Sequence, residues 1–287
     1  MESLSTTFPS RLEGLAATTT LNNGVRMPWF GLGVFKMGDD ATTEACVSAA
    51  LRAGYRHIDT ASLYGNERGV GDAVRASEVP RDEIFITTKL WNDDMRADRQ
   101  REAFEESMDK LGLETLDLYL LHWPIEGKVV ESWRVLEELH RAGRIRAIGV
   151  SNFLIPHLEA LLEVAEIPPV VNQIEFHPYL RSSPLLEFCR AKDIRVTAWS
   201  PFMQGGAILE DPVITKIAEA HGKSPAQVIL RWDLQNGVIV IPKSSREERI
   251  ESNAEVFDFT LSDAEMGAID ELDRGERSGA DPHDFDF

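Results

Sequence analysis

Short apolar, β-branched runs alternate with helical patterns along most of the chain, and this alternation limits the possible folds most strongly. Six such runs cover residues 84–88, 116–121, 145–150, 170–174, 194–199 and 238–241, and two earlier ones lie near residues 29–33 and 56–59. Strands that are separated by helices pair in parallel through right-handed crossovers. The sequence therefore predicts an α/β protein with eight parallel strands.

Two α/β architectures hold eight parallel strands, a closed (β/α)8 barrel and a doubly wound open sheet. The open sheet that binds dinucleotides carries a G-x-G-x-x-G fingerprint, whereas the segment "GLGVFK" has Lys36 at the third glycine position. A (β/α)8 barrel is typically one domain of about 250 residues. We therefore expect residues 1–287 to form a single TIM barrel domain.

Several local signals mark the ends of elements. An N-cap followed by Pro at the first helical position is predicted at Ser183 and at Asp211, and capping boxes are predicted to begin at Ser224 and Ser262. The segment "TTTLNNGVRMP" has two apolar stretches around an Asn-Gly pair, which is typical of a β-hairpin. Residues 275–287 are rich in Gly, Asp and His and are expected to form a loop.

Polar side chains follow the C-terminal ends of most of these runs. Asp59, Lys89 and His122 each close a run, and Tyr64 comes five residues after Asp59. The others that share this position are Ser151, Asn152, Gln173, Trp199, Ser200, Lys243 and Ser244. Because the C-terminal ends of barrel strands converge on the face that holds the active site, the sequence predicts one site built from these residues.

The combination of Tyr64, Lys89, Asp59 and His122 suits proton delivery to a carbonyl oxygen. A free phenol has a pKa of about 10, and a neighbouring ammonium such as that of Lys89 lowers the pKa by stabilising the phenolate. Asp59 would keep Lys89 protonated, and the imidazole of His122 could orient the substrate carbonyl. A single Tyr or His is more often structural, so the hypothesis rests on the four residues together.

Nine spaced segments follow one another over roughly residues 20–275: "GLGVFK", "HIDTASLYGNE", "TTKLWN", "LHWP", "GRIRAIGVSNF", "VNQIEFHPYL", "AWSP", "SPAQVILRW" and "IPKSSREERIESNAEVFDF". In these segments the chain resembles the aldo-keto reductases, and it looks most like their microbial branch that contains 2,5-diketo-D-gluconate reductases. The resemblance implies a (β/α)8 barrel whose N-terminal mouth is capped by the hairpin. It also implies reduction of aldehydes or ketones with NADPH, with Tyr64 as the general acid.

The resemblance further implies the cofactor site. Lys243, Ser244 and Arg249 would hold the adenosine 2'-phosphate and Asn253 the adenine, although Ser252 stands where many relatives have Glu. A guanidinium and an ammonium suit a phosphate dianion; read without the family, this segment is a solvated helix start. The nicotinamide would stack on Trp199, which could otherwise be barrel core. The remaining cofactor contacts are Gly33, Asp59, Ser151, Asn152, Gln173, Ser200 and Pro201.

Substrate contacts would come from aromatic and catalytic residues just past the strands, namely Phe35, Tyr64, Trp91, His122 and Trp123. Only a short segment, "WPIEGKV", separates His122 from the next helical pattern, whereas animal members of the family have a long loop there. The pocket should therefore be open and less selective for large apolar substrates. We expect small aldehydes, keto-sugars and dicarbonyls as substrates.

Composition restricts the partners and the compartment. A net charge of −18 without a long basic run argues against nucleic acid or an anionic membrane as partner. Cys46 and Cys189 show no metal-ligand spacing, so we expect free thiols in the reducing cytoplasm and no metal site. We also expect a monomer. Two rival functions remain: an interaction protein that keeps the cofactor site, and a barrel glycosidase, which would need paired carboxylates at strand ends.

Overall fold

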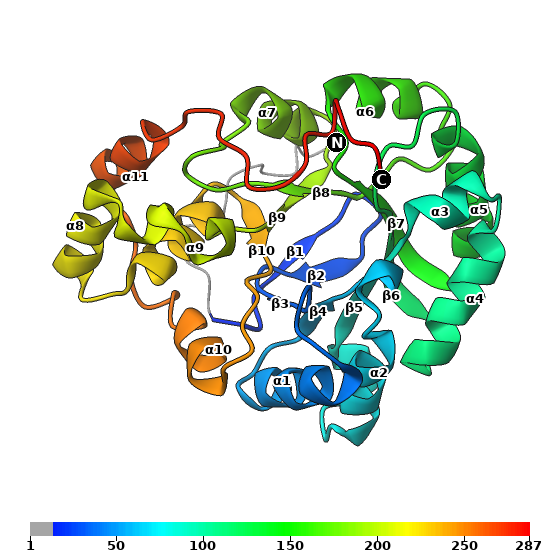
Figure 1. The fold of residues 1–287 in the computed structure, drawn as a ribbon, viewed down its shortest axis with the longest axis horizontal. Helices are drawn as coiled ribbons and strands as arrows, with labels where there is room; N and C mark the ends of the chain where they lie inside the picture. Colours follow the sequence, from blue (N-terminus) through cyan, green and yellow to red (C-terminus); the bar gives the residue numbers. More distant parts are fainter. Residues whose placement is uncertain (1–13) are drawn as a thin grey trace.

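A computed structural model describes residues 14–287, and these form a curled, all-parallel sheet surrounded by helices (Figure 1). The sheet has the order β10-β9-β8-β7-β6-β5-β4-β3, so neighbouring strands also follow one another along the chain. Within the described residues its eight strands are β3 (Leu32–Gly33), β4 (His57–Asp59), β5 (Phe85–Leu90), β6 (Leu116–Leu121), β7 (Ile145–Ser151), β8 (Val171–Glu175), β9 (Arg195–Trp199) and β10 (Val238–Val240). The predicted (β/α)8 barrel is confirmed.

The first and last strands close the sheet into a barrel. Phe30 forms a parallel bridge with Val240, and the amide of Gly31 donates to the carbonyl of Val240 at 2.8 Å. Just after this bridge a Cβ atom on Gly33 would lie only 2.7 Å from the carbonyl oxygen of Ile241. The closing strands thus approach each other more closely than a side chain at position 33 would allow.

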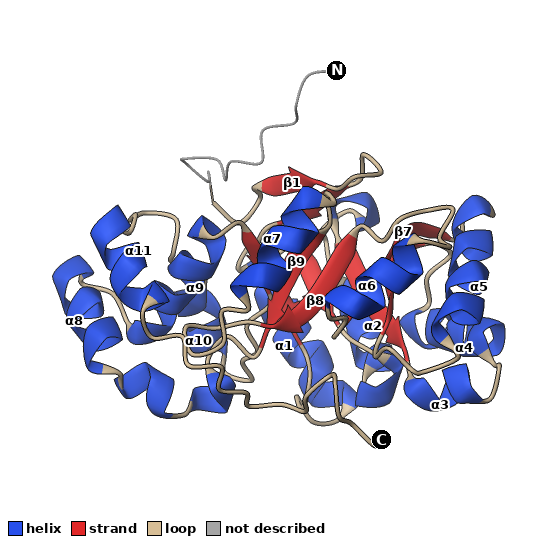
Figure 2. Ribbon diagram, turned by 90° about the horizontal axis from the view of Figure 1, so that it is seen from above, coloured by secondary structure: helices blue, strands red, loops and turns tan. Residues whose placement is uncertain are grey.

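The helices pack around the outside of the barrel (Figure 2). They are α1 (Asp40–Arg52), α2 (Glu67–Ala76), α3 (Asn92–Arg96), α4 (Gln100–Leu111), α5 (Val129–Arg141), α6 (Ile155–Leu162), α7 (Ser183–Ala191), α8 (Pro212–His221), α9 (Pro225–Gln235), α10 (Glu247–Asn253) and α11 (Asp263–Asp270), with the short 3-10 helices η1 (Ser62–Tyr64), η2 (Arg81–Glu83), η3 (Met203–Gly205) and η4 (Ala207–Glu210). Among residues 14–287, no helix combines the length and the apolar composition that a membrane span requires. Cys46 on α1 and Cys189 on α7 are buried free thiols.

Three of the four predicted helix starts are confirmed. Asp211 caps α8 by accepting from the amide of Val213, and Ser224 and Ser262 begin complete capping boxes. The prediction for Ser183 is wrong, because the N-cap of α7 is Ser182. Its carbonyl already accepts from the amides of Leu185 and Leu186, so the helix begins one residue earlier and Ser183 is its first residue.

The predicted β-hairpin caps the N-terminal mouth of the barrel. Strands β1 (Thr18–Thr20) and β2 (Arg26–Pro28) pair in antiparallel fashion. In the connecting turn, the Asn22 side chain donates to the carbonyls of Pro169 and Asp193, which precede β8 and β9. In Figure 2 the hairpin and the C-terminal end of the chain lie at opposite ends of the barrel.

Asp233 on α9 is a buried acid whose carboxylate oxygens have no hydrogen-bond partner among the described residues. Burial raises its pKa well above the usual value. Because the pKa of Asp233 is higher in the folded than in the unfolded state, its contribution to the free energy of unfolding is most favourable below the unfolded pKa of about 3.9. That contribution falls as the pH rises toward the folded pKa.

Asp233→Asn cannot ionise, so we expect it to unfold at a temperature at least about 2 °C above wild type at pH 7. The gain should shrink as the pH approaches 4. Thermal unfolding of both proteins across this range measures the effect. The control is Asp258→Asn, because Lys223 lowers the pKa of that exposed acid. Equal stability of Asp233→Asn and wild type at pH 7 and at pH 4 would contradict the prediction.

Candidate active site

Four of the residues predicted from the sequence meet at the C-terminal face of the barrel. Asp59 ends β4, Lys89 lies near the end of β5, and His122 follows β6. The ammonium of Lys89 contacts the Asp59 carboxylate at 2.5 Å and the Tyr64 hydroxyl at 3.4 Å. The ring centroids of Tyr64 and His122 are 5.8 Å apart. The phenol therefore lies between a buried ion pair and an imidazole.

The loop that carries Tyr64 is fixed by side chains whose role the sequence did not reveal. Tyr64 ends the 3-10 helix η1, which stops at Gly65 with a positive φ of 67°. Buried Asn66 donates to the carbonyl of Val34 and accepts from the hydroxyl of Thr60. Ser62 donates to the carbonyl of Lys89, which ties this helix to β5.

The ion pair keeps the Lys89 ammonium charged inside the barrel. Burial opposes the charge on Lys89, but the Asp59 carboxylate and the Tyr64 phenol outweigh that cost, so the pKa of Lys89 is above its usual value. Burial raises the pKa of Asp59, and the bonds from Lys89 and Gln173 reduce that rise. The site therefore holds a fixed positive charge beside the phenol at neutral pH.

The pKa of Tyr64 differs from the one expected from the sequence. A lowered pKa was predicted from the neighbouring ammonium, whereas the pKa of Tyr64 is raised. Burial disfavours the phenolate more than Lys89 favours it, and the Asp59 carboxylate adds to the rise. Tyr64 consequently carries its proton at neutral pH and can act as a donor.

His122 presents a neutral imidazole to the same site. Burial, together with the charge on Lys89, lowers its pKa well below the usual value. Its Nδ1 has no hydrogen-bond partner among the described residues, and its ring lies edge-on to Trp91 with centroids 5.1 Å apart. A neutral imidazole has one N–H group, which can donate to a carbonyl oxygen.

The residues expected around the nicotinamide are connected to the catalytic cluster. The side-chain amide of Gln173 on β8 donates to Asp59 at 2.7 Å, and the hydroxyl of Ser151 donates to the backbone carbonyl of Gln173. Asn152, with a positive φ of 64°, donates to the carbonyl of His122 and accepts from the Trp199 indole at 2.9 Å. These links join strands far apart in sequence, and no local pattern indicated them.

The residues expected around the 2'-phosphate lie after β10 and on α10. Lys243 and Arg249 are exposed, and neither forms an ion pair within residues 14–287. Ser244 is buried and bonds to the backbone of Arg246. Asn253 is largely buried at the end of α10. Two cations without carboxylate partners are thus available to an anion.

Aromatic rings surround the phenol and the imidazole. Phe35 is 47% exposed and lies 4.8 Å from the Tyr64 ring, while Trp123 is buried. The C-terminal residue Phe287 stacks on Trp91 with centroids 5.9 Å apart, and it also contacts Trp123. The sequence indicated a loop for residues 275–287 but not this contribution to the site, for which the phenylalanines of the segment "DFDF" were the available signal.

Comparison with known proteins gives one family. Residues 30–274 match the model of the aldo/keto reductase family. Glyoxal reductase of Bacillus subtilis is 53% identical over 95% of this chain and 99% of its own length. Morphine 6-dehydrogenase of Pseudomonas putida is 50% identical over 96% of this chain and 97% of its own length. A crystal structure of a Gox0644 mutant in complex with NADPH has a TM-score of 0.89 and 44% identity, covering 94% of this chain and 99% of that one.

Proposed function

Since the chain belongs to the aldo/keto reductase family and is an oxidoreductase acting on carbonyl groups, we propose that it uses NADPH to reduce small aldehydes, keto-sugars and dicarbonyls to alcohols. The observation that carries this proposal is the contact of the Tyr64 hydroxyl with Lys89, which Asp59 holds in place. Glyoxal reductase, a relative at 53% identity, supports dicarbonyls as one substrate class. The finer likeness to the 2,5-diketo-D-gluconate reductase branch stays a prediction.

The residues of the chain divide the chemistry between them. Bound NADPH supplies the hydride that reaches the carbonyl carbon. As the carbonyl oxygen gains the electron pair of its π bond, Tyr64 transfers the hydroxyl proton to it, and the Lys89 ammonium stabilises the resulting phenolate. His122 donates an N–H to the same oxygen and orients the carbonyl. The alcohol then leaves, and the phenolate takes a proton from water.

The cofactor residues fit a dinucleotide with a phosphate on its adenosine. Lys243 and Arg249 are exposed cations without carboxylate partners in the described chain, which suits a phosphate dianion. With its amide N–H donated to Asp59, Gln173 keeps its side-chain oxygen available to the carboxamide. The half-buried Trp199 would offer the stacking surface. We assign substrate contacts to Phe35, Trp91 and Trp123.

Steady-state oxidation of NADPH by the purified protein, with glyoxal or a simple aldehyde, tests the proposal. Turnover that depends on both substrates is the expected result. Cofactor binding without turnover would favour an interaction protein, and release of sugar from a glycoside without cofactor would favour a glycosidase. Comparing kcat/KM among keto-sugars, dicarbonyls and aromatic aldehydes would then identify the preferred class.

NADPH should bind at least about tenfold tighter than NADH, because one charge-assisted hydrogen bond contributes about 1.5 to 3 kcal/mol and about 1.4 kcal/mol corresponds to a factor of ten. Arg249→Ala should raise the Kd for NADPH by about that factor and leave the Kd for NADH nearly unchanged. Added salt should weaken the preference, since the site is exposed. Titration by quenching of tryptophan fluorescence measures both constants.

The matched control is Arg101→Ala, which removes the same charge from α4, where Arg101 pairs with Glu138. It should leave both dissociation constants unchanged. An equal loss of NADPH and NADH binding in Arg249→Ala would mean that Arg249 supports the fold and does not recognise the phosphate.

A further inference from the structure

The C-terminal tail, residues 275–287, is attached to the end of β8 through one buried carboxylate. Glu175, the last residue of β8, accepts from the amide and the hydroxyl of Ser278 at 2.6 and 2.5 Å, and from the amide of Gly279 at 3.3 Å. The Nε2 atom of His177 lies 3.2 Å from the same carboxylate. Most of the tail's polar contact with β8 therefore passes through Glu175.

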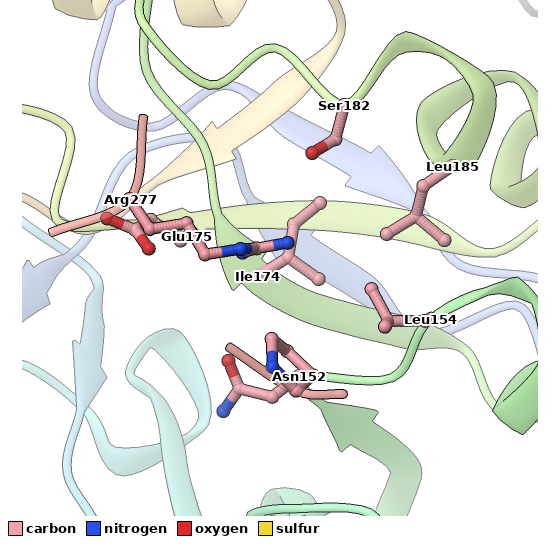
Figure 3. A pocket seen from close by; sticks show the side chains of 8 residues that line it. Asn152, Leu154, Ile174, Glu175, Ser182, Leu185 and Arg277 are labelled. Atoms are coloured by element: carbon pink, nitrogen blue, oxygen red, sulfur yellow. The ribbon is translucent and has the colours of Figure 1, made fainter. Parts of the chain in front are cut away.

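The carboxylate suits this task because it stays charged. Burial opposes the charge on Glu175, but the hydrogen bonds from His177 and Ser278 outweigh it, so the pKa of Glu175 is below its usual value. Figure 3 shows Glu175 beside the tail residue Arg277 at a small hollow that Asn152 also lines. The tail thus covers the ends of β7 and β8, from which two of the expected cofactor residues come.

The anchored segment also touches the Trp199 indole. A Cβ atom built on Gly279 would lie 2.3 Å from Cη2 and 3.0 Å from Cζ3 of Trp199, so the tail backbone packs directly against the outer end of the ring. The hydroxyl of Ser278 lies 3.1 Å from that of Ser200, the residue after Trp199. At the other end of the indole, Nε1 donates to Asn152. Trp199 is consequently held between Asn152 and the tail.

We propose that Ser278 and Gly279, anchored on Glu175, are positioning residues that set the Trp199 indole for stacking against the nicotinamide. The inference rests on the proposed function, because it needs the nicotinamide to lie on Trp199. The tail then contributes to the cofactor site as well as to the substrate pocket. Position 279 is then restricted to glycine by the indole and not by the backbone, since its φ lies outside the left-handed region.

Gly279→Ala is the direct test. The added methyl must push Trp199 aside, so we expect the Kd values for NADPH and NADH to rise together by at least about fivefold, with their ratio unchanged. This pattern differs from that of Arg249→Ala, which changes the ratio. The matched control is Gly267→Ala on α11, where a Cβ atom meets nothing within 4 Å. It should bind both cofactors as wild type does.

Glu175→Gln provides a second, independent variant. Glutamine keeps the length of the side chain but replaces one acceptor oxygen with a donor, which must face either the two donors of Ser278 or the amide of Gly279. We expect the same joint rise in both Kd values and a changed near-UV circular dichroism signal of tryptophan. Glu276→Gln, which changes an exposed carboxylate of the same tail, is the control and should do neither.

Wild-type Kd values for both cofactors in Gly279→Ala and in Glu175→Gln would overturn the inference. A changed Kd for only one of the two cofactors would overturn it as well. Either result would leave the proposed function intact as long as the wild-type protein oxidises NADPH in the presence of an aldehyde. Failure of the wild-type protein to bind either cofactor would instead refute the proposed function itself. A thermal unfolding curve of each variant shows whether it is folded at the temperature of the titration.

Discussion

Replacing Tyr64 with Phe is expected to lower kcat for aldehyde reduction by at least about 100-fold, the usual contribution of general acid catalysis. Phe keeps the ring that packs against Phe35 and His122 but removes the hydroxyl that contacts the Lys89 ammonium. The Kd for NADPH should stay close to wild type, because the hydroxyl makes no contact with the expected cofactor residues. Steady-state kinetics and fluorescence titration measure the two quantities.

The pH dependence of the wild-type activity gives a second readout for the role of Tyr64. The raised pKa of Tyr64 means that the wild-type phenol is protonated throughout the neutral range, so its reductase activity should fall only at alkaline pH. Tyr119 serves as control, since it is a fully buried tyrosine in β6 whose replacement by Phe should spare the chemistry. Near-full activity of Tyr64→Phe would remove this residue from the mechanism.

Lys89→Met should reduce kcat at least as strongly as Tyr64→Phe and should also destabilise the fold. Methionine has a similar length but no charge, so the phenolate formed after proton transfer loses its stabilising ammonium. The substitution also leaves Asp59, which is 2% exposed, without its ion-pair partner. Breaking a buried pair in this way costs about 3 to 5 kcal/mol. Kinetics and thermal unfolding of the variant measure the two effects separately.

The double variant Asp59→Asn with Lys89→Met distinguishes catalysis from stability. Removal of both charges should recover part of the lost stability, because no unpaired buried charge remains. It should not recover activity, since the phenol still lacks the ammonium. If Lys89→Met kept the height and shape of the wild-type pH-rate profile, the proposed coupling between Lys89 and Tyr64 would be wrong.

The fold could be predicted because its signals are local and periodic. Each apolar run near residues 84–88, 116–121 and 145–150 became a strand within two residues of its predicted bounds. The missing third glycine of "GLGVFK" favoured the barrel over an open sheet, and the bridge from Phe30 to Val240 closes it. The cap was predicted one residue too late, at Ser183, because two serines stand together. The hydrogen bonds to the carbonyl of Ser182 identify Ser182 as the N-cap.

The sequence by itself determined which chemical groups stand at the strand ends. The resemblance assigned Asp59, Tyr64, Lys89 and His122 to one site, and the structure brings their side chains together. Residue type and position after a strand were sufficient here because a barrel gathers all its strand ends on one face.

Only the tertiary structure decided how these groups are tuned and supported. Burial, which no local pattern reports, outweighs the Lys89 charge and raises the pKa of Tyr64 where the sequence suggested the opposite. The bonds from Gln173 to Asp59 and from Ser278 to Glu175 each span more than 100 positions. Such contacts depend on the packing of the whole barrel, because desolvation and hydrogen bonding act through space and not along the chain.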